Sequence, residues 1–121
     1  MRFISARVHG MIDIVAIAAF LLGPLLFRLG GSPALISYTI GVVHLVVTLL
    51  TRYPLGVKKI IPFPVHGILE LIVGVFLLVL PALAGYGPGS PAKRFYMLVG
   101  GFLLVVWALT AYGRVDARSE A

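Results

Sequence analysis

Two apolar stretches of the sequence carry the same pair of ionisable residues. His9 is followed four residues later by Asp13, and His66 is followed four residues later by Glu70. An i,i+4 spacing places each histidine and its acid on one face of one helix. His44 is a third histidine within an apolar stretch. Ionisable groups inside apolar helices usually face the interior of a bundle and have partners there, so we expect these five side chains to converge.

Three kinds of chemistry fit such a polar site. Hydrogen bonds between histidines and acids would fix the packing of helices, which is a structural or assembly role. Three imidazoles and two carboxylates also suffice for a divalent transition metal, and two histidines suffice as axial ligands of a haem. Chains of Asp, Glu and His also form proton or ion relays, which in so small a chain would require an oligomer. The sequence slightly favours the structural role and names no cofactor.

The composition identifies the class of protein that must position these residues. Of the 121 residues, 60% are hydrophobic and 12% are charged, whereas an ordinary soluble domain is about 25% charged. A small soluble domain has too little interior to bury so much apolar surface. We therefore exclude a water-soluble globule, a disordered chain and a nucleic-acid-binding module. No catalytic motif is found, and we do not expect an enzyme.

Four apolar stretches are long enough, or nearly so, for the roughly 20 residues that cross a bilayer as a helix. They are Val8–Phe27, Ala34–Thr51, Val65–Ala84 and Phe95–Tyr112. The sequence thus predicts a single all-α integral membrane domain over residues 1–121, a four-helix bundle. Ser-Pro pairs at 32–33 and 90–91 predict serine N-caps of the second and fourth helices. Pro24 and Pro81 come late in their stretches, where we expect them to kink or end the helix.

The lysines and arginines predict the orientation of the bundle. On one side of a four-span chain lie seven cations: Arg2, Arg7, Arg52, Lys58, Lys59, Arg114 and Arg118. On the other side lie three: Arg28, Lys93 and Arg94. Cytoplasmic loops carry the excess of positive charge, so we expect an inner-membrane protein with both termini in the cytoplasm. The five polar residues then lie in the cytoplasmic half, and Lys58 and Lys59 are candidate contacts for anionic lipid headgroups.

The second half of the sequence resembles the first. A Val-His-Gly triplet at 8–10 recurs at 65–67, and a Ser-Pro-Ala triplet at 32–34 recurs at 90–92. Leu-Thr pairs stand at 50–51 and 109–110, and Tyr53 matches Tyr112 at the same separation. These matches predict two tandem helical hairpins, at about 8–53 and 65–112. Because both begin on the same side of the membrane, the repeat is parallel, with its pseudo-two-fold axis along the membrane normal.

The pattern Val-His-Gly-x-x-acid, followed by an apolar helix with a proline near its end, resembles small bacterial SPW-repeat membrane proteins. The run Leu-Leu-Thr-Arg-Tyr-Pro-Leu-Gly at 49–56 and the run Ile-Pro-Phe-Pro-Val-His at 61–66 add to the resemblance. The Ser-Pro-Trp triplet that names the family reads Gly-Pro-Leu at 23–25 and Leu-Pro-Ala at 80–82. The resemblance implies a membrane architecture of two helix–loop units and brings no activity with it.

The remaining polar and aromatic residues carry simpler expectations. Several aromatic residues stand near the ends of apolar stretches, as in an aromatic belt at the membrane surface: Tyr53, Phe63, Tyr86, Tyr96, Trp107 and Tyr112. Thr48, Thr51 and Thr110 can return their hydroxyls to the helix backbone, and we assign them no chemistry. The expected partners are the lipid bilayer and no nucleic acid, with the chain forming a homo-oligomer or a subunit of a small membrane complex.

Overall fold

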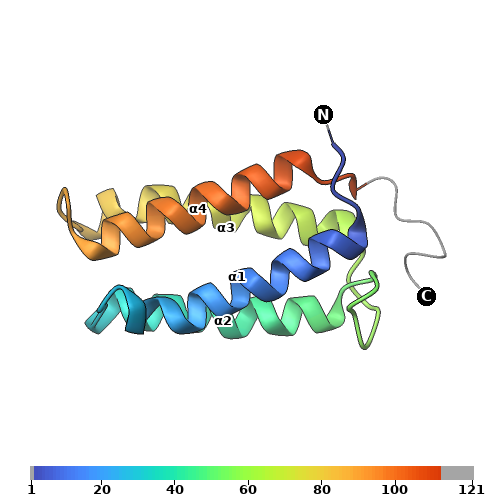
Figure 1. Ribbon diagram of the computed structural model, residues 1–121, viewed down its shortest axis with the longest axis horizontal. Helices are drawn as coiled ribbons and strands as arrows, with labels where there is room; N and C mark the ends of the chain where they lie inside the picture. Colours follow the sequence, from blue (N-terminus) through green and yellow to red (C-terminus); the bar gives the residue numbers. More distant parts are fainter. Residues whose placement is uncertain (1, 113–121) are drawn as a thin grey trace.

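The structure, a computed structural model that describes residues 2–112, is a bundle of four α-helices (Figure 1). They are α1 (Ala6–Leu26), α2 (Gly31–Leu50), α3 (Phe63–Ala84) and α4 (Pro91–Leu109). Helix α1 packs closely along α2, and α3 packs closely along α4, whereas the two pairs contact each other more sparsely. The predicted all-α fold of two consecutive helical hairpins is therefore confirmed.

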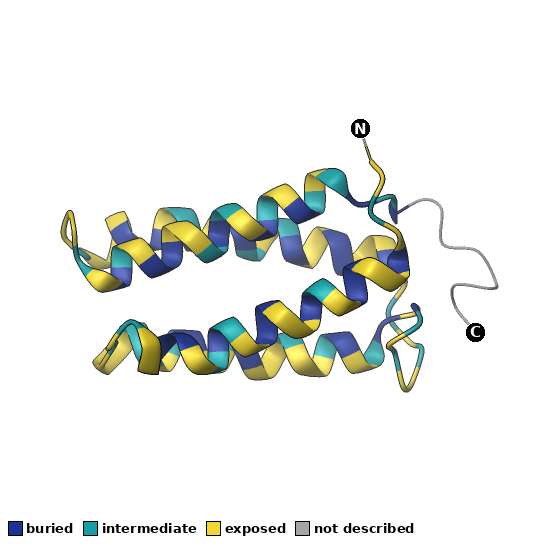
Figure 2. Ribbon diagram, viewed as in Figure 1, coloured by how far each residue is buried: buried dark blue, intermediate teal, exposed yellow. Residues whose placement is uncertain are grey.

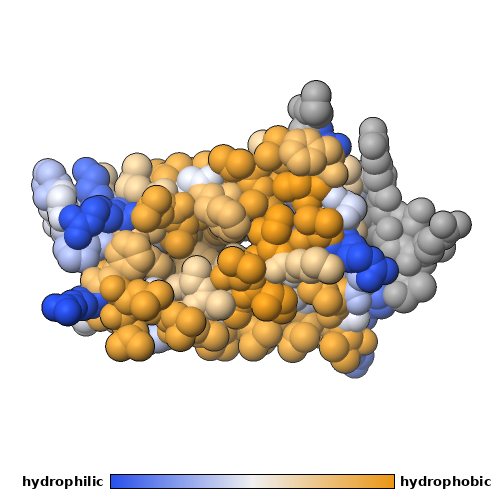
Figure 3. Space-filling model, viewed as in Figure 1, coloured by the Kyte–Doolittle hydropathy of each residue, from blue (hydrophilic) through white to orange (hydrophobic). Residues whose placement is uncertain are grey.

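The helices have the length and surface of membrane spans. Each of the four is long and apolar enough to cross a membrane. Large apolar side chains, among them Leu22, Ile72 and Phe102, are exposed on the outside of the bundle. Figure 3 shows the resulting apolar surface along the bundle, with hydrophilic residues gathered at its two ends. By helix length and hydropathy, the chain is a multi-pass membrane protein.

The helices begin two to four residues before the apolar stretches predict. The hydroxyl of Ser5 accepts a hydrogen bond from the Val8 backbone N–H at 3.2 Å and caps α1. The hydroxyl of Ser90 caps α4 as predicted, whereas the predicted Ser32 cap is wrong because α2 already begins at Gly31. Ser32 instead forms a hydrogen bond of 3.1 Å with the hydroxyl of Tyr86, which joins the tips of the two hairpins.

The start of each hairpin is joined to the end of the other by a short parallel backbone bridge. One bridge pairs Thr51 with Ile61, and the other pairs Ile4 with Thr110. In each bridge, the isoleucine N–H donates to the carbonyl oxygen of the residue before the threonine, at 2.8 and 2.9 Å respectively. Both bridges lie at the end of the bundle where α1 and α3 begin (Figure 1). They fix the helix starts, and with them His9 and His66, relative to the opposite hairpin.

Two buried apolar clusters lie along the inside of the bundle (Figure 2). The larger, around Phe20, Leu77 and Phe95, fills the half near the hairpin tips. The smaller, which includes Tyr53 and Phe63, fills the end that holds the two bridges. The candidate polar residues lie between these clusters, because the ring of His9 packs against Phe63 and the ring of His44 packs against Phe20.

Candidate functional site

The polar side chains of α1 and α3 meet inside the bundle. Nε2 of His9 lies 2.9 Å from Oε2 of Glu70 and 3.2 Å from Oδ1 of Asp13. Nε2 of His66 lies 3.2 Å from Oδ2 of Asp13 and 3.6 Å from Oε2 of Glu70. Each histidine therefore faces the acid of its own helix and the acid of the other hairpin. All four residues are buried, and we call them the tetrad.

His44 of α2 stands at the edge of the tetrad. Its Nε2 lies 3.2 Å from Oδ1 of Asp13, and its ring centroid lies 6.1 Å from that of His66. The structure thus brings together all five residues singled out from the sequence. The tetrad is the tightest group, because one ligand atom from each of its members lies within 4.8 Å of all the others.

Two threonines determine which nitrogen of each tetrad histidine carries a proton. The hydroxyl of Thr110 donates a hydrogen bond to the carbonyl oxygen of Val106 at 2.6 Å. In the same way, the hydroxyl of Thr51 donates to the carbonyl oxygen of Val47 at 2.6 Å. Each hydroxyl oxygen also lies 2.9 Å from Nδ1 of a histidine, which is His9 for Thr110 and His66 for Thr51. Because a hydroxyl has a single proton to donate, Nδ1–H must be the donor in both contacts. When the imidazoles are neutral, they therefore present the lone pair of Nε2 to the carboxylates.

Tyr53 completes the surroundings of Asp13. Its hydroxyl donates to Oδ2 of Asp13 at 2.7 Å. Burial, together with the negative charge of Asp13, raises the pKa of Tyr53, so the phenol keeps its proton and remains a donor. Tyr86 and Trp107 are partly exposed, whereas the prediction of a belt at the membrane surface is wrong for four buried residues, Tyr53, Phe63, Tyr96 and Tyr112. These residues cover the ends of the bundle interior instead.

The surroundings of the two acids differ. Asp13 accepts hydrogen bonds from Tyr53 and His44. Among residues 2–112, neither oxygen of Glu70 has a partner that meets the geometry of a hydrogen bond, and the same is true of the Tyr112 hydroxyl. The place in α4 that matches His44 of α2 is occupied by Leu103. Glu70 is therefore the acid of the site with free acceptor capacity.

The chain matches no protein-family model, no curated protein and no solved structure. Its chemistry must therefore be inferred from the site itself.

The lysines of the α2–α3 loop have different surroundings. Nζ of Lys59 donates a hydrogen bond to the carbonyl oxygen of Tyr53 at 3.0 Å. This bond joins two parts of the α2–α3 loop next to the tyrosine that contacts Asp13. Lys58 is exposed and remains available as the predicted contact for lipid headgroups. Two further cations used to predict orientation, Arg114 and Arg118, lie outside the described residues.

Sequence reasoning missed the threonines and the tyrosine that surround the tetrad. Thr51 and Thr110 return their hydroxyls to the helix backbone as expected, but their oxygens also accept from the histidines. The signal was present, because the Leu-Thr pairs and the tyrosines recur at matching places in the two halves of the sequence. Thr51 and Thr110 recur at the ends of α2 and α4, just as His9 and His66 recur near the starts of α1 and α3. This shared recurrence indicates that each threonine lies beside a histidine.

Proposed function

We propose that the chain is a small inner-membrane protein that holds one divalent transition-metal ion inside the bundle. The ligands are Nε2 of His9 and His66 and one carboxylate oxygen each from Asp13 and Glu70. The observation that supports the proposal is the orientation of the two imidazole rings, whose Nε2 atoms both point at the carboxylates. Their Nδ1–H groups are held by Thr110 and Thr51, as second-sphere partners hold metal-binding histidines.

The spacing of the four ligand atoms suits an ion. A tetrahedral ion with bonds of about 2.0–2.1 Å keeps its ligand atoms roughly 3.3 Å apart. The nitrogen–oxygen separations in the tetrad are 2.9, 3.2, 3.2 and 3.6 Å, measured to Oε2 of Glu70 and to both oxygens of Asp13. One ligand atom from each of the four residues lies within 4.8 Å of the others. Nε2 of His9 and Oε2 of Glu70, although close, do not have the alignment of a hydrogen bond. Atoms that converge without hydrogen-bonding to one another are the arrangement expected around a shared ion.

Charge balance also supports a divalent ion. Two neutral imidazoles, two carboxylates and a 2+ ion sum to zero charge. Without the ion, the same sum requires both imidazoles to be protonated. Net charge is expensive in a bilayer interior. Binding should therefore exchange the ion for two protons, so that the tetrad stays neutral in both states.

The donor set narrows the choice of metal. Two imidazoles with two carboxylates suit Zn²⁺, Fe²⁺ and Mn²⁺, and the chain has no cysteine that would favour softer ions. A haem does not fit, because Asp13 and Glu70 occupy the space that both Nε2 atoms face. Four protein ligands leave no open position on a tetrahedral ion, which favours a structural or carrier role over catalysis.

The setting of this site follows from the sequence. We infer that the two hairpins are tandem repeats of the SPW type, an inference supported by the matched histidine–threonine contacts and backbone bridges. We further infer that both termini lie in the cytoplasm, because five cations lie at the start of α1 or in the α2–α3 loop, at the same end of the bundle: Arg2, Arg7, Arg52, Lys58 and Lys59. The tetrad, near the starts of α1 and α3, is then in the cytoplasmic half.

A second candidate function is the structural role without metal. The pairs His9–Glu70 and His66–Asp13 both cross between the hairpins, whose other contacts are sparse. With both imidazoles protonated, these pairs would hold the hairpins together electrostatically. This candidate predicts that the chain binds no stoichiometric metal and that loss of one acid destabilises the bundle.

Metal binding to the purified protein distinguishes the two candidates. The chain is purified in detergent without a polyhistidine tag, stripped with EDTA and titrated with Zn²⁺ by calorimetry in two buffers of different ionisation enthalpy. We expect one ion per chain and the release of about two protons, as the charge balance requires. His66→Ala should abolish binding. His44→Ala, which removes an imidazole outside the tetrad, should weaken binding by about 10–100-fold at most. Absence of stoichiometric binding by the wild-type chain would leave the structural role.

A further inference from the structure

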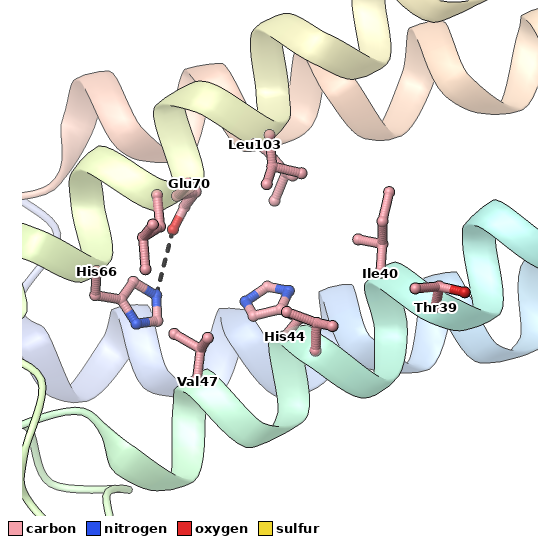
Figure 4. Close-up of a pocket in the computed structure, with 10 residues that line it drawn as sticks. Thr39, Ile40, His44, Val47, His66, Glu70 and Leu103 are labelled. Atoms are coloured by element: carbon pink, nitrogen blue, oxygen red, sulfur yellow. Dashed lines mark ion pairs between the residues drawn. The ribbon is translucent and has the colours of Figure 1, made fainter.

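A cavity of about 200 Å³ lies between α2 and α3, beside the tetrad (Figure 4). Most of its wall consists of aliphatic side chains, including Ile40, Val43 and Val73. Val43 is exposed on the outside of the bundle, so the cavity borders the lipid-facing surface. Its inner end is polar, because His44 and Glu70 reach it from the two helices. The cavity therefore joins an apolar entrance to ionisable groups.

A second cavity provides an internal comparison. It has a volume of about 310 Å³ and lies between α1 and α4, at the place that matches the first cavity in the other pair of helices. Its wall is entirely apolar. Leu103 lines the second cavity and occupies the sequence position that matches His44 of the first cavity. An ordinary packing gap between membrane helices would resemble the second cavity, so the polar end of the first needs a separate explanation.

The polar end offers hydrogen-bond acceptors. Oε1 of Glu70 is buried and has no hydrogen-bond partner among the described residues. An unpartnered buried acceptor is rare in proteins, and each instance calls for an explanation. Nε2 of His44 is the ring nitrogen in contact with Asp13, so Nδ1 is its second polar atom. A molecule that satisfies these groups must bring a donor.

We propose that this cavity binds a lipid-soluble molecule with a hydroxyl head group, and that the Glu70 carboxylate turns so that Oε1, which is covered in this structure, accepts a hydrogen bond from that hydroxyl. A dry apolar cavity of about 150 Å³ holds a benzene molecule. The present cavity therefore accommodates one ring with a few carbons, and a longer tail extends between the helices into the lipid. The proposal does not depend on a bound metal, because Oε2 of Glu70 is the oxygen that faces the histidines and Oε1 is a separate oxygen without a partner among the described residues.

Two probes that differ by one hydrogen-bond donor test the proposal. Binding of 4-butylphenol and of its methyl ether, 4-butylanisole, is measured by calorimetry with the EDTA-treated protein in lipid nanodiscs. Empty nanodiscs give the background from partition into lipid. We expect the phenol to bind about tenfold more tightly or better, since a hydrogen bond to a charged acceptor is stronger than one between neutral groups. Equal affinities would overturn the proposal.

A pair of valine variants locates the binding site. Val43→Phe fills the mouth of the cavity and introduces the residue that Phe102 provides at the matching place in α4. Val42→Phe makes the same change at an exposed neighbour that does not line the cavity. We expect the first variant to lose phenol binding by at least tenfold and the second to keep it. Unchanged binding in Val43→Phe would overturn the proposal.

The experiment also separates this proposal from the proposed metal site. Val43→Phe should bind Zn²⁺ as the wild-type chain does, because Val43 contributes no ligand atom. Phenol binding by a chain that binds no metal would refute the metal site alone. Metal binding by a chain indifferent to the phenol hydroxyl would refute the cavity proposal alone.

Discussion

The threonine contacts of the tetrad histidines give the sharpest test of how the site is built. Thr110→Val replaces a hydroxyl by a methyl group of similar size. The Nδ1–H of His9, which is fully buried, then loses its acceptor at 2.9 Å. The carbonyl oxygen of Val106 also loses the hydroxyl that donates to it at 2.6 Å. The change therefore removes two hydrogen bonds while it leaves the packing volume nearly constant.

The expected loss follows from the burial of these groups. A buried donor left without a partner costs about 1–3 kcal/mol. We expect a decrease near the upper end of that range in the free energy of unfolding for Thr110→Val, because an acceptor is orphaned as well. Thr51→Val should cause a similar decrease, because the contact of Thr51 with His66 has the same length. Zn²⁺ affinity should fall by about 10–100-fold in both variants, as expected when a second-sphere partner is removed.

Thr48 supplies the matched control. It is a fully buried threonine of α2 that lies beside Tyr53, and its hydroxyl has no partner with the geometry of a hydrogen bond among the described residues. Thr48→Val should therefore be neutral or slightly stabilising, since it removes an unsatisfied polar group. The assay is equilibrium unfolding in detergent micelles, measured for the wild type and the three valine variants under metal-free conditions.

Two results would refute the reasoning. One is an equal loss of stability in Thr48→Val and Thr110→Val, which would show that the histidine contact has no particular weight. The other comes from long-range ¹H–¹⁵N spectra of the zinc-loaded wild type. We expect the proton of His9 and of His66 on Nδ1, with Nε2 bound to the ion. A proton on Nε2 of either histidine would mean that the threonine does not set the tautomer.

The α2–α3 loop gives two further predictions in the same unfolding assay. A raised pKa means that the fold holds the Tyr53 proton more tightly, so this stabilisation is complete below about pH 10, the ordinary pKa of tyrosine, and decreases above it. The unfolding free energy of the wild type should therefore fall more steeply above pH 10 than that of Tyr53→Phe, and equal slopes would contradict the assignment. Gly56→Ala should destabilise by more than about 3 kcal/mol, because its Cβ would lie 1.8 Å from the carbonyl oxygen of Thr51, whereas Gly87→Ala, with nothing within 4 Å, should be nearly neutral. Similar losses in the two alanine variants would contradict this.

The sequence predicts the helices and the meeting of the five ionisable residues because both depend on strong local signals. Apolar length identifies a membrane span, and the i,i+4 spacing of His9 and Asp13 identifies one helix face. The helix starts were placed late because the capping turns are polar or contain proline, as at Ser90, and so fall outside an apolar stretch. Local signals of this kind do not report contacts between hairpins.

The surroundings of the tetrad could not be predicted from single residues. Thr110 follows the last helix and reaches His9 near the start of the first, a separation of 101 residues. The aromatic belt was predicted for Tyr53 because amphipathic rings near span ends usually sit at the membrane surface. The α2–α3 loop instead folds back over the bundle end, where the Tyr53 hydroxyl finds an acceptor in Asp13. The repeat was the one sequence feature that connected these distant positions.

The two acids of the tetrad, which stand at matching places in the two halves of the sequence, have different surroundings. Asp13 is surrounded by donors, because His44 and Tyr53 both bond to it. Glu70 has no such donors, since the position that matches His44 is Leu103. Asp13 is therefore held by hydrogen bonds from the protein, while Glu70 has one oxygen toward the histidines and one without a partner among the described residues. If both proposals hold, an ion and a hydroxyl group share Glu70, and linkage then requires that each changes the affinity for the other by the same factor.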